Sequence, residues 1–158
     1  MKIMTDTNIL FSALLFPESR PAKALFHIAE HHNLVLCDYI ISELRDVVSR
    51  KRPDLLADIE VLLAKLPYEL ISAPLQPCKL IQDPKDHPIL NAAIIANVDI
   101  IISGDNHFLK LEMEHPKPMS VANFLDIMMK YNPKTSQSAK GAVGRGENRY
   151  KSRSKYGR

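Results

Sequence analysis

Asp99-Ile100-Ile101-Ile102-Ser103-Gly104-Asp105 is the stretch of this 158-residue chain that decides its fold class. Three consecutive isoleucines are apolar on both faces, which is typical of a strand buried inside a parallel sheet. The run then ends in serine, glycine and aspartate, so a polar turn follows the strand directly. Lys2-Ile3-Met4-Thr5-Asp6 has the same form, a short strand that ends at an acid. The chain therefore has two strands of one kind, each followed by an aspartate.

Helical and strand-like patterns alternate along the rest of the chain. A compact apolar run at 34–37 predicts another buried strand, and 68–71 predicts an edge strand. Asp38 is expected to be the N-cap of the helix after the 34–37 strand. Strand, helix, strand, helix with near-continuous apolar strands predicts an α/β fold, in which helices cover both faces of a central parallel sheet. The other helices are expected over residues 10–15, 22–29, 55–66 (opened by Pro53), 89–96 and 121–129.

Four acids are expected at one edge of this sheet. Asp6 and Asp105 follow separate strands, and the carboxyl ends of parallel strands meet at the same edge, where open α/β sheets bind ligands. Asp86, with Asp83 before it, stands at the start of the 89–96 helix, and Glu43 lies in the first turns of the helix after the second strand. In a parallel layout, all four positions can converge.

Carboxylates that converge must take up protons or bind a cation at neutral pH. Hard oxygen ligands suit Mg²⁺ or Mn²⁺, and Mg²⁺ often shares its coordination shell with phosphate oxygens. A carboxylate pocket of this kind fits phosphodiester hydrolysis, in which the metal activates a water and neutralises charge on the scissile phosphate.

Each acid alone also has a structural interpretation. Asp6 and Asp105 could be ordinary turn residues after their strands. Asp86 could be an N-cap, helped by Pro88 in the first turn, and Glu43 could face solvent opposite a basic residue. The four acids together favour the metal site more strongly than any one of them does.

Charge divides the chain into two regions. Of the 21 basic and 18 acidic residues, eight basic and one acidic residue lie in 134–158, which leaves 13 basic and 17 acidic residues in the rest. The terminal region is rich in glycine and poor in large aliphatic residues, so a disordered basic tail is expected over 133–158, after a single domain over 1–132. Such a tail could attract a polyanion such as RNA, or it could only improve solubility.

Composition also indicates the compartment. No apolar run approaches the ~20 residues of a membrane helix, and no signal peptide is expected, so the interpretation is a cytoplasmic protein without a membrane partner. Cys37 and Cys78 are too few for a disulfide framework and lack metal-site spacing. We interpret them as small buried residues in a reducing compartment.

Three separated motifs resemble those of PIN domains, in the branch described as toxins of toxin–antitoxin pairs (VapC-like ribonucleases). The opening Met4-Thr5-Asp6-Thr7-Asn8-Ile9-Leu10 resembles the family's first strand and turn. The stretch 83–93, with Asp-Pro-Lys-Asp at its start, resembles the central acidic helix start, and 99–105 followed by Phe108-Leu109 resembles the last strand and acidic turn. The resemblance covers roughly residues 1–130, although the basic tail is not part of the usual domain.

The resemblance implies a three-layer α/β/α sandwich and a divalent-metal endoribonuclease. Our hypothesis from these residues is that the enzyme cuts single-stranded RNA and leaves a 3′-hydroxyl and a 5′-phosphate. The resemblance also implies that four acids bind the metal and are catalytic, and that three polar residues near the metal support them. A cognate antitoxin that inserts a basic residue into the acidic cleft is a further implication. So is a homodimer through helical faces such as the 55–66 stripe, although core packing explains that stripe equally well. The implied acids are Asp6, Glu43, Asp86 and Asp105, and the supporting residues are Asn8, Asp83 and Ser103.

Two other functions remain open at this point. A catalytically silent PIN-like domain could bind RNA or act as a scaffold, although such domains usually lose one or more of the acids. An aspartate-nucleophile phosphatase would need a second aspartate two residues after Asp6, where this chain has Asn8.

The basic residues and histidines of region 1–132 do not point to a particular function. The run Arg50-Lys51-Arg52 could touch an RNA backbone or could be a solvated helix end. His87 and His107 flank two of the acids but are interpreted as surface or turn residues. No role is assigned to His27, His31 and His32, which lie on or near one helix end.

Overall fold

The structure is a computed structural model that describes residues 1–74 and 87–131. The chain divides into two compact units, Met1–Asp126 and Ile127–Arg158, and of the second only the end of the last helix is described. The elements are β1 (Lys2–Thr5), α1 (Thr7–Leu15), α2 (Arg20–His31), β2 (Asn33–Cys37), α3 (Asp38–Lys51), the 3₁₀ turn η1 (Pro53–Leu55), α4 (Leu56–Lys65), β3 (Tyr68–Ile71), α5 (His87–Ile95), β4 (Ile100–Ile102), α6 (Asn106–Leu109), β5 (Lys117–Met119) and α7 (Val121–Tyr131).

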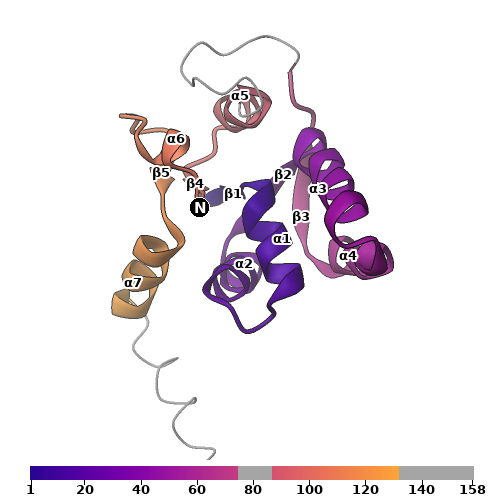
Figure 1. Ribbon diagram of the computed structural model, residues 1–158. Coiled ribbons are helices and arrows are strands. Elements are labelled where there is room, and N and C mark those ends of the chain that lie inside the picture. Colours follow the sequence, from indigo (N-terminus) through magenta and orange to yellow (C-terminus); the bar gives the residue numbers. More distant parts are fainter. Residues whose placement is uncertain (75–86, 132–158) are drawn as a thin grey trace, which may run out of the picture. The chain divides into compact units, whose positions relative to one another are not determined.

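A five-stranded parallel sheet in the order β3-β2-β1-β4-β5 forms the centre of the first unit (Figure 1). β1 lies between β2 and β4, with Met4 aligned with Val35 on one side and with Ile101 on the other. The connections β1 to β2 and β2 to β3 step in one direction across the sheet, whereas β3 to β4 and β4 to β5 step in the other. Right-handed crossovers therefore place their helices on opposite faces, which gives a three-layer α/β/α fold and a switch point between β1 and β4.

The strands are held by continuous apolar burial. Ile3, Met4, Ile101 and Ile102 have no solvent exposure, and neither has any residue of the run 34–37. The two chain stretches that predicted the fold class are thus adjacent central strands, and the predicted α/β fold with a parallel sheet is confirmed. A strand buried on both faces cannot alternate polar and apolar residues, which is why these runs are apolar throughout.

Two details of the local structure differ from the sequence-based expectations. α3 begins at Asp38 itself, its N-cap is Cys37, and no side chain caps it, so the prediction that Asp38 is the N-cap was wrong. The helix starts directly where β2 ends, and one Asp38 carboxylate oxygen instead accepts hydrogen bonds from the amides of Tyr39 and Ala73, each at 2.8 Å. α6 and the edge strand β5 were not predicted; β5 is three residues long and contains Pro118, so its sequence has no apolar run.

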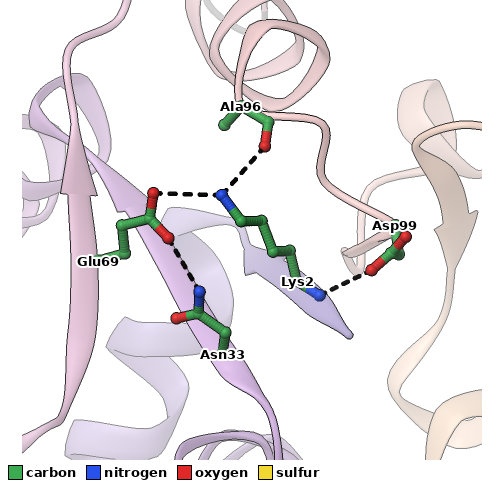
Figure 2. Close-up of polar contacts among 5 residues, drawn as sticks. All are labelled: Lys2, Asn33, Glu69, Ala96 and Asp99. Atoms are coloured by element: carbon green, nitrogen blue, oxygen red, sulfur yellow. Dashed lines mark hydrogen bonds and ion pairs between the residues drawn. The ribbon is translucent and has the colours of Figure 1, made fainter.

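The amino ends of the strands are joined by a polar network (Figure 2). The Lys2 ammonium lies 3.3 Å from a Glu69 carboxylate oxygen and 3.4 Å from the Ala96 carbonyl oxygen. The Lys2 amide donates to Asp99 at 2.7 Å, and the Asn33 side chain donates to Glu69 at 2.9 Å. Four strands, β3, β2, β1 and β4, are thereby linked at this edge by paired charges and amides.

Several expectations concern residues outside 1–74 and 87–131. Asp83, Asp86 and Cys78 lie there, as does the predicted tail 133–158, so these interpretations stay predictions. Cys37 is a free and buried thiol, and burial raises its pKa above the ordinary value. Among the described residues, no helix is both long and apolar enough to cross a membrane.

Candidate metal centre

Asp6 follows β1 at the switch point and immediately precedes α1. Its carboxylate is the N-cap of α1 and accepts a hydrogen bond from the Ile9 amide at 2.9 Å. Its own amide donates to the Ile102 carbonyl oxygen of the neighbouring strand at 3.1 Å, which fixes the residue to β4 as well. Asp6 is only 4% exposed, so the protein holds a carboxylate almost entirely out of water at the carboxyl edge of the sheet.

Ser103 connects Asp6 to Asp105. Its hydroxyl donates to the second carboxylate oxygen of Asp6, in a contact that is fully buried, and accepts a hydrogen bond from the Asp105 amide at 2.9 Å. Asp105 is half-buried and is the N-cap of α6, where its carboxylate accepts from the His107 amide at 2.8 Å. The structure therefore brings together two predicted acids and one predicted supporting residue, all positioned by the ends of β1 and β4.

Glu43 reaches the same edge from α3. Its carboxylate accepts a hydrogen bond from the Thr7 hydroxyl, and Thr7 is the first residue of α1, next to Asp6. Glu43 is half-buried, whereas Thr7 is buried. The side chain is thus aimed across the seam between α3 and α1 toward the Asp6 position.

Sequence reasoning missed Thr7. Its position directly after Asp6 was visible, but its contact depends on how α1 packs against α3, which no local pattern reveals. Asn8, predicted as a supporting residue, is exposed in the first turn of α1. The sequence shows only that the first turn of α1 carries a polar residue, Asn8.

Among the residues that the structure describes, no lysine or arginine forms an ion pair with the acids of this edge. Within residues 1–74 and 87–131, the one basic side chain at ion-pairing distance is His107, whose Nδ1 lies 3.9 Å from an Asp105 carboxylate oxygen. Burial raises the pKa of Asp6 above its ordinary value, the charge of Asp105 raises it further, and hydrogen bonds from Ser103, Ile9 and Gly104 oppose the shift. An acid in this state gains from any cation that enters the site.

The described acids alone do not complete a metal cage. In the ranges that the structure covers, no three acidic, histidine or cysteine side chains form a group that could enclose an ion. The fourth predicted acid, Asp86, immediately precedes α5 and lies outside those ranges. The Ala96 carbonyl oxygen, just after α5, accepts a hydrogen bond from the Lys2 ammonium, so α5 ends at the amino edge of the sheet. The first residues of α5 therefore lie toward the carboxyl edge. The donor set of buried and half-buried carboxylate oxygens at this edge is the one that Mg²⁺ and Mn²⁺ use.

Comparison with known proteins gives the family. A family model described as PIN domain matches residues 2–107, which is most of the described chain. The chain belongs to the PIN domain family. No curated protein matches the chain in sequence.

Solved structures support the fold of this PIN domain. One chain of the crystal structure of VapBC2 from Rickettsia felis, bound to a DNA fragment from their promoter, superposes with a TM-score of 0.60 at 17% sequence identity. The match covers 76% of this chain and 98% of the other. At 17% identity, the likeness concerns only the arrangement of helices and strands. That arrangement agrees with the three-layer fold and with the PIN domain family.

Proposed function

We propose that this PIN domain is a divalent-metal-dependent endoribonuclease that hydrolyses phosphodiester bonds of single-stranded RNA. The observation that carries the proposal is the pair Asp6 and Asp105, tied through the Ser103 hydroxyl at the switch point of the sheet with no lysine or arginine to balance them in the described residues. Membership of the PIN domain family supports the same conclusion.

Asp6, Glu43, Asp86 and Asp105 would hold Mg²⁺ or Mn²⁺, with Asn8, Asp83 and Ser103 as polar residues in support. When bound, such an ion lowers the pKa of a water and neutralises charge on the scissile phosphate. The protein's own part is positioning. Ser103 fixes the rotamer of Asp6, Thr7 fixes that of Glu43, and the amides of Ile9 and His107 hold one oxygen each of Asp6 and Asp105.

Cleavage of a labelled single-stranded RNA tests the proposal. Purified protein is incubated with Mn²⁺, Mg²⁺ or EDTA, beside the double variant Asp6→Asn, Asp86→Asn. We expect metal-dependent products that carry a 5′-phosphate from the wild type and none from the variant. Equal cutting by both proteins would assign the activity to a contaminant and contradict the proposal. Mn²⁺ binding by the wild type without cleavage of any RNA would favour the silent RNA-binding or scaffold domain instead.

We further propose that the chain acts as the toxin of a toxin–antitoxin pair. The support is the fold likeness to a chain of the VapBC2 structure, which was solved bound to a DNA fragment from the promoter. An antitoxin would block the site by placing a basic side chain among the carboxylates, because charge-assisted hydrogen bonds to an uncompensated acid are strong. Co-expression with the product of an adjacent small reading frame should suppress RNA cleavage by the purified complex; unchanged cleavage would contradict the toxin assignment.

A homodimer through helical faces remains part of the proposal. α4 buries Ile59 and Leu63 but leaves Leu56 and Val61 39% and 50% exposed. Val61 lines an apolar cavity of about 440 Å³ between α1, α2 and α4, with Leu14 and Phe26 on its other walls. This cavity is lined by none of the four acids, so we assign it to protein contact and keep the chemistry at the carboxyl edge. Light scattering of the purified chain should give twice the monomer mass, and a monomer would exclude the dimer.

A further inference from the structure

Lys51 is an exposed cation held over an aromatic ring. It is the last residue of α3, and its ammonium lies 5.8 Å from the centroid of the Phe11 ring on α1. Among the described residues it forms no ion pair, unlike its neighbour Arg52, which lies 2.6 Å from Asp54, or Arg45, which lies 2.7 Å from Glu60. The charge of Lys51 is thus free to meet an anion, and the ring limits how its side chain can move.

Two contacts between α1 and α3 place Lys51 relative to the acids. Thr7 and Phe11 are one turn apart on α1, and their partners Glu43 and Lys51 are two turns apart on α3, so the helices run alongside each other in the same direction. Side chains lean toward the N-terminus of their helix, which brings the Lys51 ammonium back toward Glu43. Four residues of α1 rise by about 6 Å. Phe11, the ring that the Lys51 ammonium lies over, is therefore about one helical turn along the seam from the Thr7–Glu43 contact.

We propose that Lys51 binds a backbone phosphate of the RNA strand next to the scissile phosphate, with Phe11 holding its side chain in position. The inference rests on the proposed ribonuclease function. Residues outside the tail carry an excess of acids, 17 against 13 basic residues, so a basic side chain beside the seam between α1 and α3 would favour the approach of a polyanion there. Arg52 is already paired with Asp54, and Lys51 is the member of the basic run that sits beside the seam.

A competing explanation is that the Lys51 stem only covers the Phe11 ring. Lys51→Met separates the two explanations, because methionine keeps an unbranched apolar stem on the ring and removes the charge. Lys51→Arg restores the charge. The matched control is Lys65→Met, an exposed lysine in the last turn of α4, the helix that leads into the amino end of β3.

The experiment measures binding of a fluorescein-labelled single-stranded RNA in EDTA across a salt series, and then KM and kcat with metal. We expect Lys51→Met to bind RNA about fivefold more weakly. Its slope of log affinity against log salt should fall by about 0.7, the value for one lost phosphate contact on a single strand. KM should rise with kcat within about twofold, and Lys51→Arg and Lys65→Met should behave as the wild type.

The outcomes separate this inference from the proposed function. If the wild type cuts RNA and Lys51→Met has an unchanged affinity and salt slope, Lys51 only packs on Phe11 and the inference is overturned while the nuclease stands. If the wild type binds RNA through Lys51 but never cuts it, the phosphate site stands and the nuclease proposal falls. If the wild type neither binds nor cuts RNA, both are overturned.

Discussion

The two edges of the sheet use the same kinds of residue in opposite ways. At the amino edge, Glu69 forms an ion pair with the ammonium of Lys2, and Asp99 accepts a hydrogen bond from the Lys2 amide (Figure 2). At the carboxyl edge, Asp6 and Asp105 meet hydroxyl and amide donors and no lysine or arginine of the described residues. The amino edge is built to stabilise the fold, whereas the carboxyl edge is left with negative charge that a ligand has to balance.

This difference has an energetic meaning. Hydrogen bonds from Ser103 and Ile9 orient the Asp6 carboxylate but do not remove its charge, and its burial raises the pKa. Proteins keep such unfavourable groups where function requires them and compensate elsewhere in the fold. Substitutions that exchange an acid for its amide should therefore have opposite consequences at the two edges.

The largest expected effect comes from two aspartates at the two ends of β4. Asp105→Asn should lower RNA cleavage by at least about 100-fold, because a lost ligand removes several kcal/mol of charge stabilisation in the transition state. Asp99→Asn, which keeps an oxygen acceptor for the Lys2 amide, should leave cleavage within about twofold. Single-turnover assays in Mn²⁺ measure both. Comparable losses in the two variants would show that the edges do not differ in function.

Removal of the shared hydroxyl should have the next largest effect. Ser103→Ala frees the Asp6 carboxylate from its buried partner and leaves the Asp105 amide without its acceptor. Loss of an orienting group of this kind commonly lowers metal affinity by about 10- to 100-fold. Mn²⁺ titration followed by cleavage rate measures the change. A variant with wild-type metal dependence would mean that Ser103 supports the strand ends only.

Asp6→Asn should stabilise the metal-free protein. An acid with a raised folded-state pKa stabilises the fold at low pH, and this contribution is lost as the pH rises through that pKa. Asparagine removes the buried charge and still caps α1, so we expect a gain on the order of 1 kcal/mol at pH 7 in EDTA. Mn²⁺ should raise the melting temperature of the wild type and not that of the variant. If metal-free Asp6→Asn were less stable than the metal-free wild type, the buried charge of Asp6 would not destabilise the fold at this edge.

The sequence predicted some parts of the fold and of the site and not others. The strands β1, β2 and β4 and the acids after them were predictable because burial on both faces demands unbroken apolar runs and the acids follow these runs directly. The Thr7–Glu43 contact and the tie from Asp38 to Ala73 were not, because they depend on packing between elements distant in sequence. β5 gave no signal because Lys117 is exposed and Pro118 suits only an edge strand.

The smallest effect concerns a histidine cluster at the amino edge. His27 stacks on His31 at 4.4 Å between ring centroids and contacts His32 and Phe124 edge-on. Burial lowers the pKa of His27 and of His32, and the charges of neighbouring histidines lower both further; the N-terminal amine adds to this for His32.

Imidazoles with lowered pKa stabilise the fold above their unfolded-state pKa, and this contribution is lost as the pH falls below it. Urea unfolding should therefore show lower stability at pH 5 than at pH 7, with a smaller difference in a His27→Gln, His32→Gln variant. The comparison is best made in an Asp6→Asn background, since Asp6 responds to pH in the opposite direction. An equal pH response in both proteins would exclude the cluster as its source.

Calorimetric titration of Mn²⁺ into the apo-protein tests most directly the claim that the carboxyl edge is a metal centre. The three proteins are the wild type, Asp6→Asn and, as the control from the amino edge, Glu69→Gln. We expect the wild type and Glu69→Gln to bind Mn²⁺ with the same affinity and Asp6→Asn to bind at least about tenfold more weakly. Unchanged binding by Asp6→Asn, or an equal loss in Glu69→Gln, would contradict that claim.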